Sequence, residues 1–164
     1  MNLPPLIKKG VSIGYNGIDL FDEKDIEKGQ IGYSRLANGT SIVGQENGDW
    51  LAHWLVMGRE PNLGDPIFID ISNPDFPIYT AAHGEGSWSP ELISSTYSGF
   101  LRIIEKLEVL AAKRRNPTKM QENPMTKEEY DEFIEFVSDK GGLVDASFWE
   151  ILIADEEAGI GPEI

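Results

Sequence analysis

Apolar residues recur with the period of an α-helix over a long stretch near the middle of the chain. Ser89-Pro90-Glu91 precedes this stretch with an N-cap hydroxyl, a proline suited to the first helical position and an acid near the positive end of the helix dipole. The apolar positions that follow fall on one broad face of a helix, and they are Ile93, Tyr97, Phe100, Leu101, Ile104, Leu107 and Ala111. We therefore predict a long helix that lies on a sheet, with Phe100, Leu101 and Ile104 buried.

Strands are predicted ahead of this helix. Residues 67–71 and 78–81 are rich in β-branched and aromatic side chains and are bounded by turn residues. Residues 31–37, 40–45 and 49–57 are separated by two Asn-Gly pairs, which favour hairpin turns with positive φ at Gly39 and Gly48. We expect about five antiparallel strands, and an α+β fold in which the long helix covers one face of the sheet.

The strand predicted at residues 49–57 carries apolar side chains on both faces. Alternation places Trp50, Ala52, Trp54 and Val56 on one face and Leu51, His53, Leu55 and Met57 on the other. A strand of this kind is covered on both sides. Residues 1–30 show little pattern beyond an Asn16-Gly17 turn signal and a short helix at residues 22–28.

A pair of helices is predicted near the end of the chain. Thr126 and Glu129 form a capping-box pattern, and the apolar stripe that follows ends at Gly141-Gly142. Asp145 can cap a last helix whose inward residues are Phe148, Trp149, Leu152 and Ile153. We divide the chain into an α+β domain at residues 1–117 and an acidic helical appendage at residues 118–164, packed on the same domain.

Charge is concentrated in that appendage. The net charge of the chain is −14. Residues 1–117 hold 11 basic and 15 acidic residues, net −4, whereas residues 118–164 hold 3 and 13, net −10. An acidic chain repels nucleic acid, so no nucleic-acid partner is expected. The acids around the stripe are either a solvated face or a surface for a protein partner, and they are Glu128, Glu129, Asp131, Glu132 and Glu135.

Composition removes several other classes of function. Cysteine is absent, which excludes thiol catalysis, zinc–thiolate sites and a disulfide framework and suits a reducing compartment. No apolar run reaches the 18 residues of a spanning helix, and no charged-then-apolar leader begins the sequence. We expect a cytoplasmic protein with no membrane contact and no cofactor.

A small set of residues invites chemical hypotheses. Asp65, Asp70, His83 and His53 are types that ligate metals or transfer protons, but no metal-binding spacing joins them, so turn, cap and loop hydrogen bonds are the favoured explanation. Gly84-Glu85-Gly86 lacks the remaining features of a phosphate loop, and Glu85 would repel a phosphate. Of the four tryptophans, we expect Trp54 and Trp149 in the core and Trp88 at the rim of a cleft beside the His83 loop, where a small ligand or peptide would bind.

Several short motifs occur together in the middle of the chain: Gly64-Asp65 before a strand that ends in an acid, Pro77-Ile78-Tyr79 leading to His83-Gly84, then Trp88 and a helix with Phe100-Leu101. This combination resembles the SUKH superfamily, which contains fungal cell-wall-assembly regulators and bacterial immunity proteins against secreted toxins. The likeness covers roughly residues 12–110. The usual opening amphipathic helix is not obvious, although Leu3-Pro4 is a candidate remnant of it, and the segment after Asn116 has no counterpart.

The resemblance implies a non-enzymatic protein-binding module, and in particular an immunity protein that neutralises a bacterial toxin such as a basic nuclease. Two alternatives stay open. One is a small metal-dependent hydrolase that uses Asp65, Asp70 and His83. The other is an intracellular regulatory scaffold like the fungal members.

Overall fold

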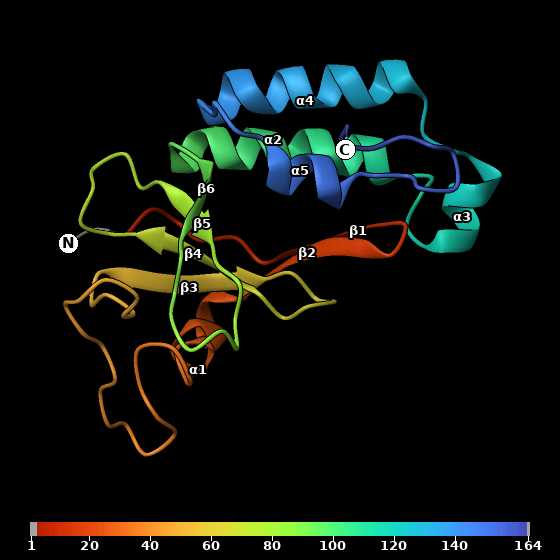
Figure 1. Cartoon of the computed structure of the whole chain (residues 1–164). Coiled ribbons are helices and arrows are strands. Elements are labelled where there is room, and N and C mark those ends of the chain that lie inside the picture. Colours follow the sequence, from red (N-terminus) through yellow and green to blue (C-terminus); the bar gives the residue numbers. More distant parts are fainter. Residues whose placement is uncertain (1–2, 164) are drawn as a thin grey trace.

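A six-stranded antiparallel sheet forms the centre of the molecule, in a computed structural model that describes residues 3–163. Its strands follow one another in chain order: β1 (Lys9–Ile13), β2 (Asn16–Leu20), β3 (Trp54–Arg59), β4 (Pro66–Asp70), β5 (Ile78–Thr80) and β6 (Glu91–Ser94). The α-helices are α1 (Ile26–Gly29), α2 (Tyr97–Ala111), α3 (Pro117–Glu122), α4 (Lys127–Gly141) and α5 (Ser147–Leu152). Helices α2, α4 and α5 lie on one side of the sheet and α1 on the other (Figure 1). The predicted α+β class is confirmed, with six strands rather than five.

The first hairpin, β1–β2, lies in the part of the chain where little pattern was found. Ile13 pairs with Asn16, so the turn falls at Gly14-Tyr15, and the predicted turn at Asn16-Gly17 is wrong. The reason is tertiary, because the Asn16 side chain donates hydrogen bonds to the carbonyls of Ile151 and Leu152 at 3.3 and 3.2 Å. The alternating residues Val11, Ile13, Ile18 and Leu20 are buried, which is the packing that stabilises the hairpin.

Residues 31–53 form turns and isolated bridges instead of the predicted strands. Both predicted glycine turns are confirmed, with φ of +87° at Gly39 and +94° at Gly48. The backbone around these turns forms hydrogen bonds within residues 31–53, for example from Ile42 N–H to the Ser34 carbonyl at 3.0 Å. It does not form a ladder of hydrogen bonds with the sheet. Turn chemistry is local and was therefore predictable, whereas a strand also needs a neighbouring edge with free hydrogen-bonding groups. Only residues 54–59 find such an edge, between β2 and β4.

The long helix begins later than the sequence indicates. Ser89-Pro90-Glu91 does not start it, because Glu91–Ser94 is strand β6, paired with β5. Helix α2 begins at Tyr97, and the Thr96 side chain caps it by accepting a hydrogen bond from Gly99 N at 3.0 Å. Ile93 is buried, but it belongs to strand β6. Its spacing from Tyr97 matches the helical period by coincidence, which is why it was assigned to the helix.

The phase of α2 also corrects one core residue. Phe100 and Ile104 are buried as predicted, but Leu101 is only half-buried at the edge of the core. Ile103, which was not predicted, is fully buried. Ile103 lies next to Gly141, one turn after Gly99, so it is buried on the side of α2 that packs against α4.

The C-terminal helices pack against α2 and complete the core. The Thr126–Glu129 capping box at the start of α4 is confirmed, and Gly142 ends α4 in the left-handed conformation. The sequence of residues 118–124 is typical of a polar linker, but residues 117–122 form α3, with Asn116 as its N-cap. Gly99 of α2 allows the end of α4 to approach closely, since a Cβ there would lie 2.2 Å from the Lys140 carbonyl oxygen. Trp149 of α5 is fully buried and donates from its indole to the Ile93 carbonyl at 2.9 Å.

Two separate hydrophobic clusters cover the two faces of the sheet. The larger lies between the sheet and α2, α4 and α5, and takes in Leu55 and Met57 of β3. The smaller lies on the opposite face and takes in Val56 and Trp54 of β3. The predicted alternation within 54–57 is therefore confirmed, and β3 is covered on both sides.

Candidate functional site

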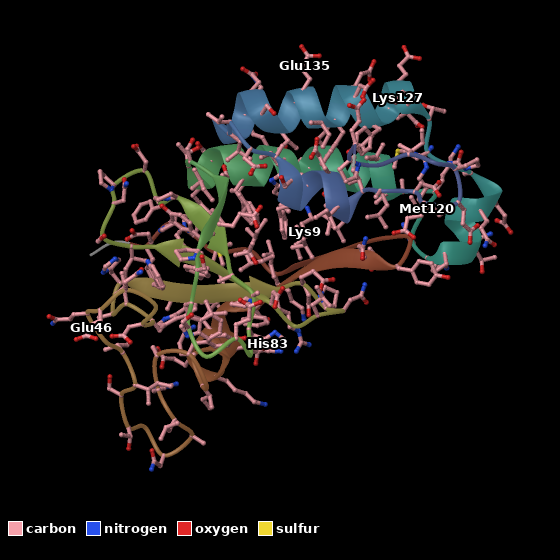
Figure 2. The ribbon with its side chains drawn as sticks, viewed as in Figure 1. Lys9, Glu46, His83, Met120, Lys127 and Glu135 are labelled. Atoms are coloured by element: carbon pink, nitrogen blue, oxygen red, sulfur yellow. The ribbon has the colours of Figure 1, made fainter. Side chains whose placement is uncertain are left out.

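The acidic residues predicted as a binding surface lie on α4, which packs on α2 and presents its outer side to solvent. Glu135 points away from the body of the protein (Figure 2). Glu128, Asp131, Glu132 and Glu135 are exposed. Among residues 3–163, no Lys, Arg or His lies within ion-pair distance of Glu128, Glu132 or Glu135, whereas Asp131 pairs with Lys127. Since these three glutamates are separated by four and three residues, they share one face of the helix, which we call the α4 acidic face.

Glu129 differs from the other four acids. Its carboxylate oxygens accept from the Arg114 guanidinium at 3.0 and 2.8 Å and from the Thr126 backbone N–H at 3.0 Å. Burial on its own would raise the pKa of Glu129, but the hydrogen bonds from the Thr126 backbone, Arg114 and the Thr126 hydroxyl outweigh it, so the pKa lies below its ordinary value. Glu129 thus has a structural role that its neighbours on α4 do not share.

Asp65 and His83 lie together at one end of β4. Asp65 Oδ1 is 2.8 Å from His83 Nδ1 and accepts from the His83 backbone N–H at 3.0 Å. Both contacts fix the loop after β5 to the turn before β4. An imidazole oriented by a carboxylate is a geometry that general bases use, but here it also has the simpler effect of holding the loop.

Asp70 and His53 lie at the opposite end of β4. Asp70 Oδ1 accepts from the Ser72 backbone N–H at 2.9 Å and from its hydroxyl at 2.6 Å, while Oδ2 is 3.8 Å from His53 Nε2. A strand rises about 3.3 Å per residue, so Asp65 and Asp70 are separated by roughly 16 Å. Asp65, Asp70 and His83 therefore do not converge, and within residues 3–163 no three His, Asp or Glu side chains are grouped as metal ligands would be.

An aromatic layer covers the face of the sheet opposite α2, and we define it as Tyr33, Trp50, Trp54, Phe68, Tyr79 and Trp88. Trp50 is at its centre, with ring centroids 4.7 Å from Phe68, 5.1 Å from Tyr33, 5.2 Å from Trp88 and 5.4 Å from Trp54. Trp149 is in the core as predicted, but Trp50 rather than Trp54 is the buried tryptophan of this layer. The prediction was wrong for Trp50 because this residue lies in the irregular segment before β3 and not in the strand itself.

The loop from His83 to Trp88 borders this layer. Trp88 is half-buried, and its backbone N–H donates to the Gly48 carbonyl at 2.8 Å. His83 and Glu85 are exposed. Trp88 packs edge-to-face against Trp50 and in a tilted geometry against Tyr33, with ring centroids 5.2 and 5.5 Å apart, so it forms an edge of the layer.

The two aspartates act on opposite ends of the aromatic layer. Burial, followed by the charge of Asp65, raises the pKa of Tyr33, and Arg59 partly offsets the shift. Burial, followed by the charge of Asp70, raises the pKa of Tyr79. A tyrosine with the ordinary pKa of 10.0 is already protonated at neutral pH, and both shifts favour the same state.

A groove that was not predicted from the sequence is bounded by the β1–β2 turn, α3 and the segment after α5. Its lining includes Tyr15, Met120 and Ile151, which are far apart in the chain. Ile151 lies between the inward residues Trp149 and Leu152, off their stripe, and an apolar residue off the buried face is the one signal that could have pointed here.

No family model, curated protein or solved structure matches the chain. The SUKH resemblance therefore rests on the motifs quoted above. In the part of the chain that the structure describes, no helix combines the length and apolar character needed to cross a membrane.

Proposed function

We propose that this protein is a non-enzymatic, cytoplasmic protein-binding module that neutralises a basic bacterial toxin domain. The observation that carries the proposal is the α4 acidic face, where Glu128, Glu132 and Glu135 project together without ion-pair partners among the described residues. The immunity role itself comes from the SUKH resemblance.

The charges on this face favour rapid association. A toxin that cleaves nucleic acid tends to carry a basic surface, because its substrate is a polyanion. A blocker with a net charge of −14 is attracted to such a surface at long range. Attraction of this kind increases the association rate more than the final affinity, and it weakens as salt is added.

The experiment searches the neighbouring genes for a basic toxin domain to use as the ligand. It then compares two triple variants with the same change in charge. Glu128→Lys, Glu132→Lys and Glu135→Lys reverse the α4 acidic face. Glu23→Lys, Asp25→Lys and Glu46→Lys reverse exposed acids elsewhere on the molecule. Stopped-flow association at several salt concentrations is the measurement.

We expect the α4 variant to associate at least about tenfold more slowly at low salt, and the control variant to stay closer to wild type. Equal rates for the two variants would rule out the α4 acidic face as the steering surface. Failure of the wild-type protein to bind or protect against any basic toxin domain would overturn the immunity role. Recovery of a partner that is not a toxin would instead favour the regulatory scaffold.

A further inference from the structure

The groove at the α3 end of the molecule has a volume of about 840 Å³. Met120 marks its position at that end (Figure 2). Three chain segments form it: the β1–β2 turn, helix α3, and residues 151–162 at and after the end of α5. The larger apolar side chains of its lining are Tyr15, Pro117, Met120, Ile151, Ile160 and Pro162.

Hydrogen bonds hold the walls of the groove in place. The Asn16 side chain joins the β1–β2 turn to the end of α5 through the Ile151 and Leu152 carbonyls. The Asp155 carboxylate accepts from the Met125 backbone N–H at 3.0 Å, which ties the last segment to the start of α4. Asp155 and Ile160 also exchange backbone hydrogen bonds at 2.8 and 2.9 Å. The groove is therefore formed before any partner binds, which lowers the entropic cost of binding.

Two large apolar side chains in the groove are left in water. Tyr15 is 72% exposed and Ile151 is 61% exposed. Met120, by contrast, is buried against the β1–β2 turn and forms part of the floor. Exposed apolar side chains around a formed concavity are typical of a binding site rather than of an ordinary surface.

The charged residues of the groove are all acidic within the described part of the chain. Asp155, Glu156 and Glu157 contribute carboxylates, and no Lys, Arg or His is among the lining residues that the structure describes. The two carboxylate oxygens of Asp155 accept hydrogen bonds from the Met125 and Ala158 backbone amides. Glu157 accepts a hydrogen bond from the Gln121 side chain at 2.9 Å. Glu156 is exposed at the rim. The occupant should therefore be apolar at its centre and positively charged around it.

We propose that this groove binds a segment of a partner protein in which aliphatic side chains are flanked by Lys or Arg. The aliphatic side chains pack against Tyr15 and Ile151, and the cations lie beside Glu156 and Glu157. This inference does not depend on the partner being a toxin. A second copy of this chain is disfavoured as occupant because each copy carries a net charge of −14.

The test uses the fluorescently labelled peptide Lys-Arg-Leu-Leu-Arg-Lys, with binding followed by anisotropy at physiological salt and located by NMR amide shifts. Two peptides separate the contributions: Lys-Arg-Ser-Ser-Arg-Lys lacks the apolar centre, and Glu-Asp-Leu-Leu-Asp-Glu has the opposite charge. We expect the first peptide alone to bind with shifts at Tyr15, Met120 and Ile151, and each change to weaken binding by at least about tenfold.

Matched variants assign the binding to the groove. Ile151→Arg and Glu156→Lys should each reduce affinity by about tenfold or more. Val109→Arg, at a 76% exposed position on α2, and Glu46→Lys introduce the same charges elsewhere and should leave the affinity near wild type. Melting curves establish that each variant is folded.

Three results would overturn the inference: no binding of the leucine peptide at millimolar concentration, equal binding of the serine peptide, or unchanged affinity in Ile151→Arg. Amide shifts confined to α4 would also overturn it, because they would place the peptide on the α4 acidic face. Sedimentation that gives a dimer lost in Ile151→Arg would assign the groove to a second copy. A loss of toxin steering in the α4 variant with peptide affinity retained would show that the two surfaces act separately.

Discussion

The guanidinium of Arg114 donates to both carboxylate oxygens of Glu129, at 3.0 and 2.8 Å, and its side chain is only 5% exposed. The same guanidinium donates to the carbonyls of Leu110, Asn123 and Pro124. One buried cation therefore joins the end of α2, the segment after α3 and the start of α4.

Replacing Glu129 with Gln should destabilise the fold by about 1–3 kcal/mol, since a buried charge loses its charged partner while its carbonyl acceptors remain. Glu128→Gln is the control, because Glu128 is exposed on the same helix. Urea unfolding gives the free energies. Equal stability of the two variants would mean that Arg114 is satisfied without Glu129.

The lowered pKa of Glu129 predicts a pH dependence of stability. A carboxyl whose pKa is lower in the folded protein than in the unfolded chain stabilises the fold above its unfolded pKa, near the ordinary value of 4.5. That contribution is lost as the pH falls through the lower folded value. The stability difference between wild type and Glu129→Gln should therefore shrink between about pH 6 and about pH 3. A difference that stays constant over this range would contradict the assignment.

The orientation of α2 in the core can be tested with two nearby residues. Ile103→Ala should cost about 2–5 kcal/mol, because Ile103 is fully buried and its truncation leaves a cavity. Leu101→Ala should cost clearly less, because Leu101 lies at the edge of the core. Chemical denaturation of both variants is the measurement. A larger loss for Leu101→Ala would mean that α2 is rotated relative to this structure.

Gly48 and Gly39 provide a matched pair in the segment over the aromatic layer. Both have positive φ, so alanine at either position should cost about 1–2 kcal/mol. At Gly48 a Cβ would also lie 3.0 Å from Ser87 Cβ, whereas at Gly39 it would meet nothing within 4 Å. Thermal melts should rank Gly48→Val as least stable, then Gly48→Ala, then Gly39→Ala. Equal melting temperatures for the two alanine variants would show that the Ser87 loop moves aside freely.

The elements that the sequence predicted correctly are those specified by local chemistry. The Thr126–Glu129 capping box, the Gly142 end of α4 and the turns at Gly39 and Gly48 all depend on neighbouring residues. Several errors concern pairing between distant segments, whereas α3 was missed although Asn116 and Pro117 provide a local helix start. Residues 31–53 carry strand-like composition but find no ladder, and Glu91–Ser94 pairs with β5 although Ser89-Pro90 offers a helix start.

The candidate sites divide in the same way. The acids of α4 surround an apolar stripe that is visible in the sequence, so their exposure could be predicted. The engagement of Glu129 by Arg114 could not, because it depends on a chain reversal through α3. The groove was also beyond prediction, since Tyr15 and Ile151 meet only after β1–β2 and α5 have packed together.

The tryptophans lie on two different faces of the sheet, so their fluorescence reports on two different parts of the molecule. Trp50, Trp54 and Trp88 lie in the aromatic layer on one face of the sheet, and Trp149 lies in the core on the other. In a Trp149→Phe protein, all indole emission would come from the layer that holds residues 31–53 and the His83 loop. The sheet thus separates two groups of fluorescent side chains. Local unfolding of the aromatic layer can therefore be followed by tryptophan fluorescence while the core on the other face stays folded.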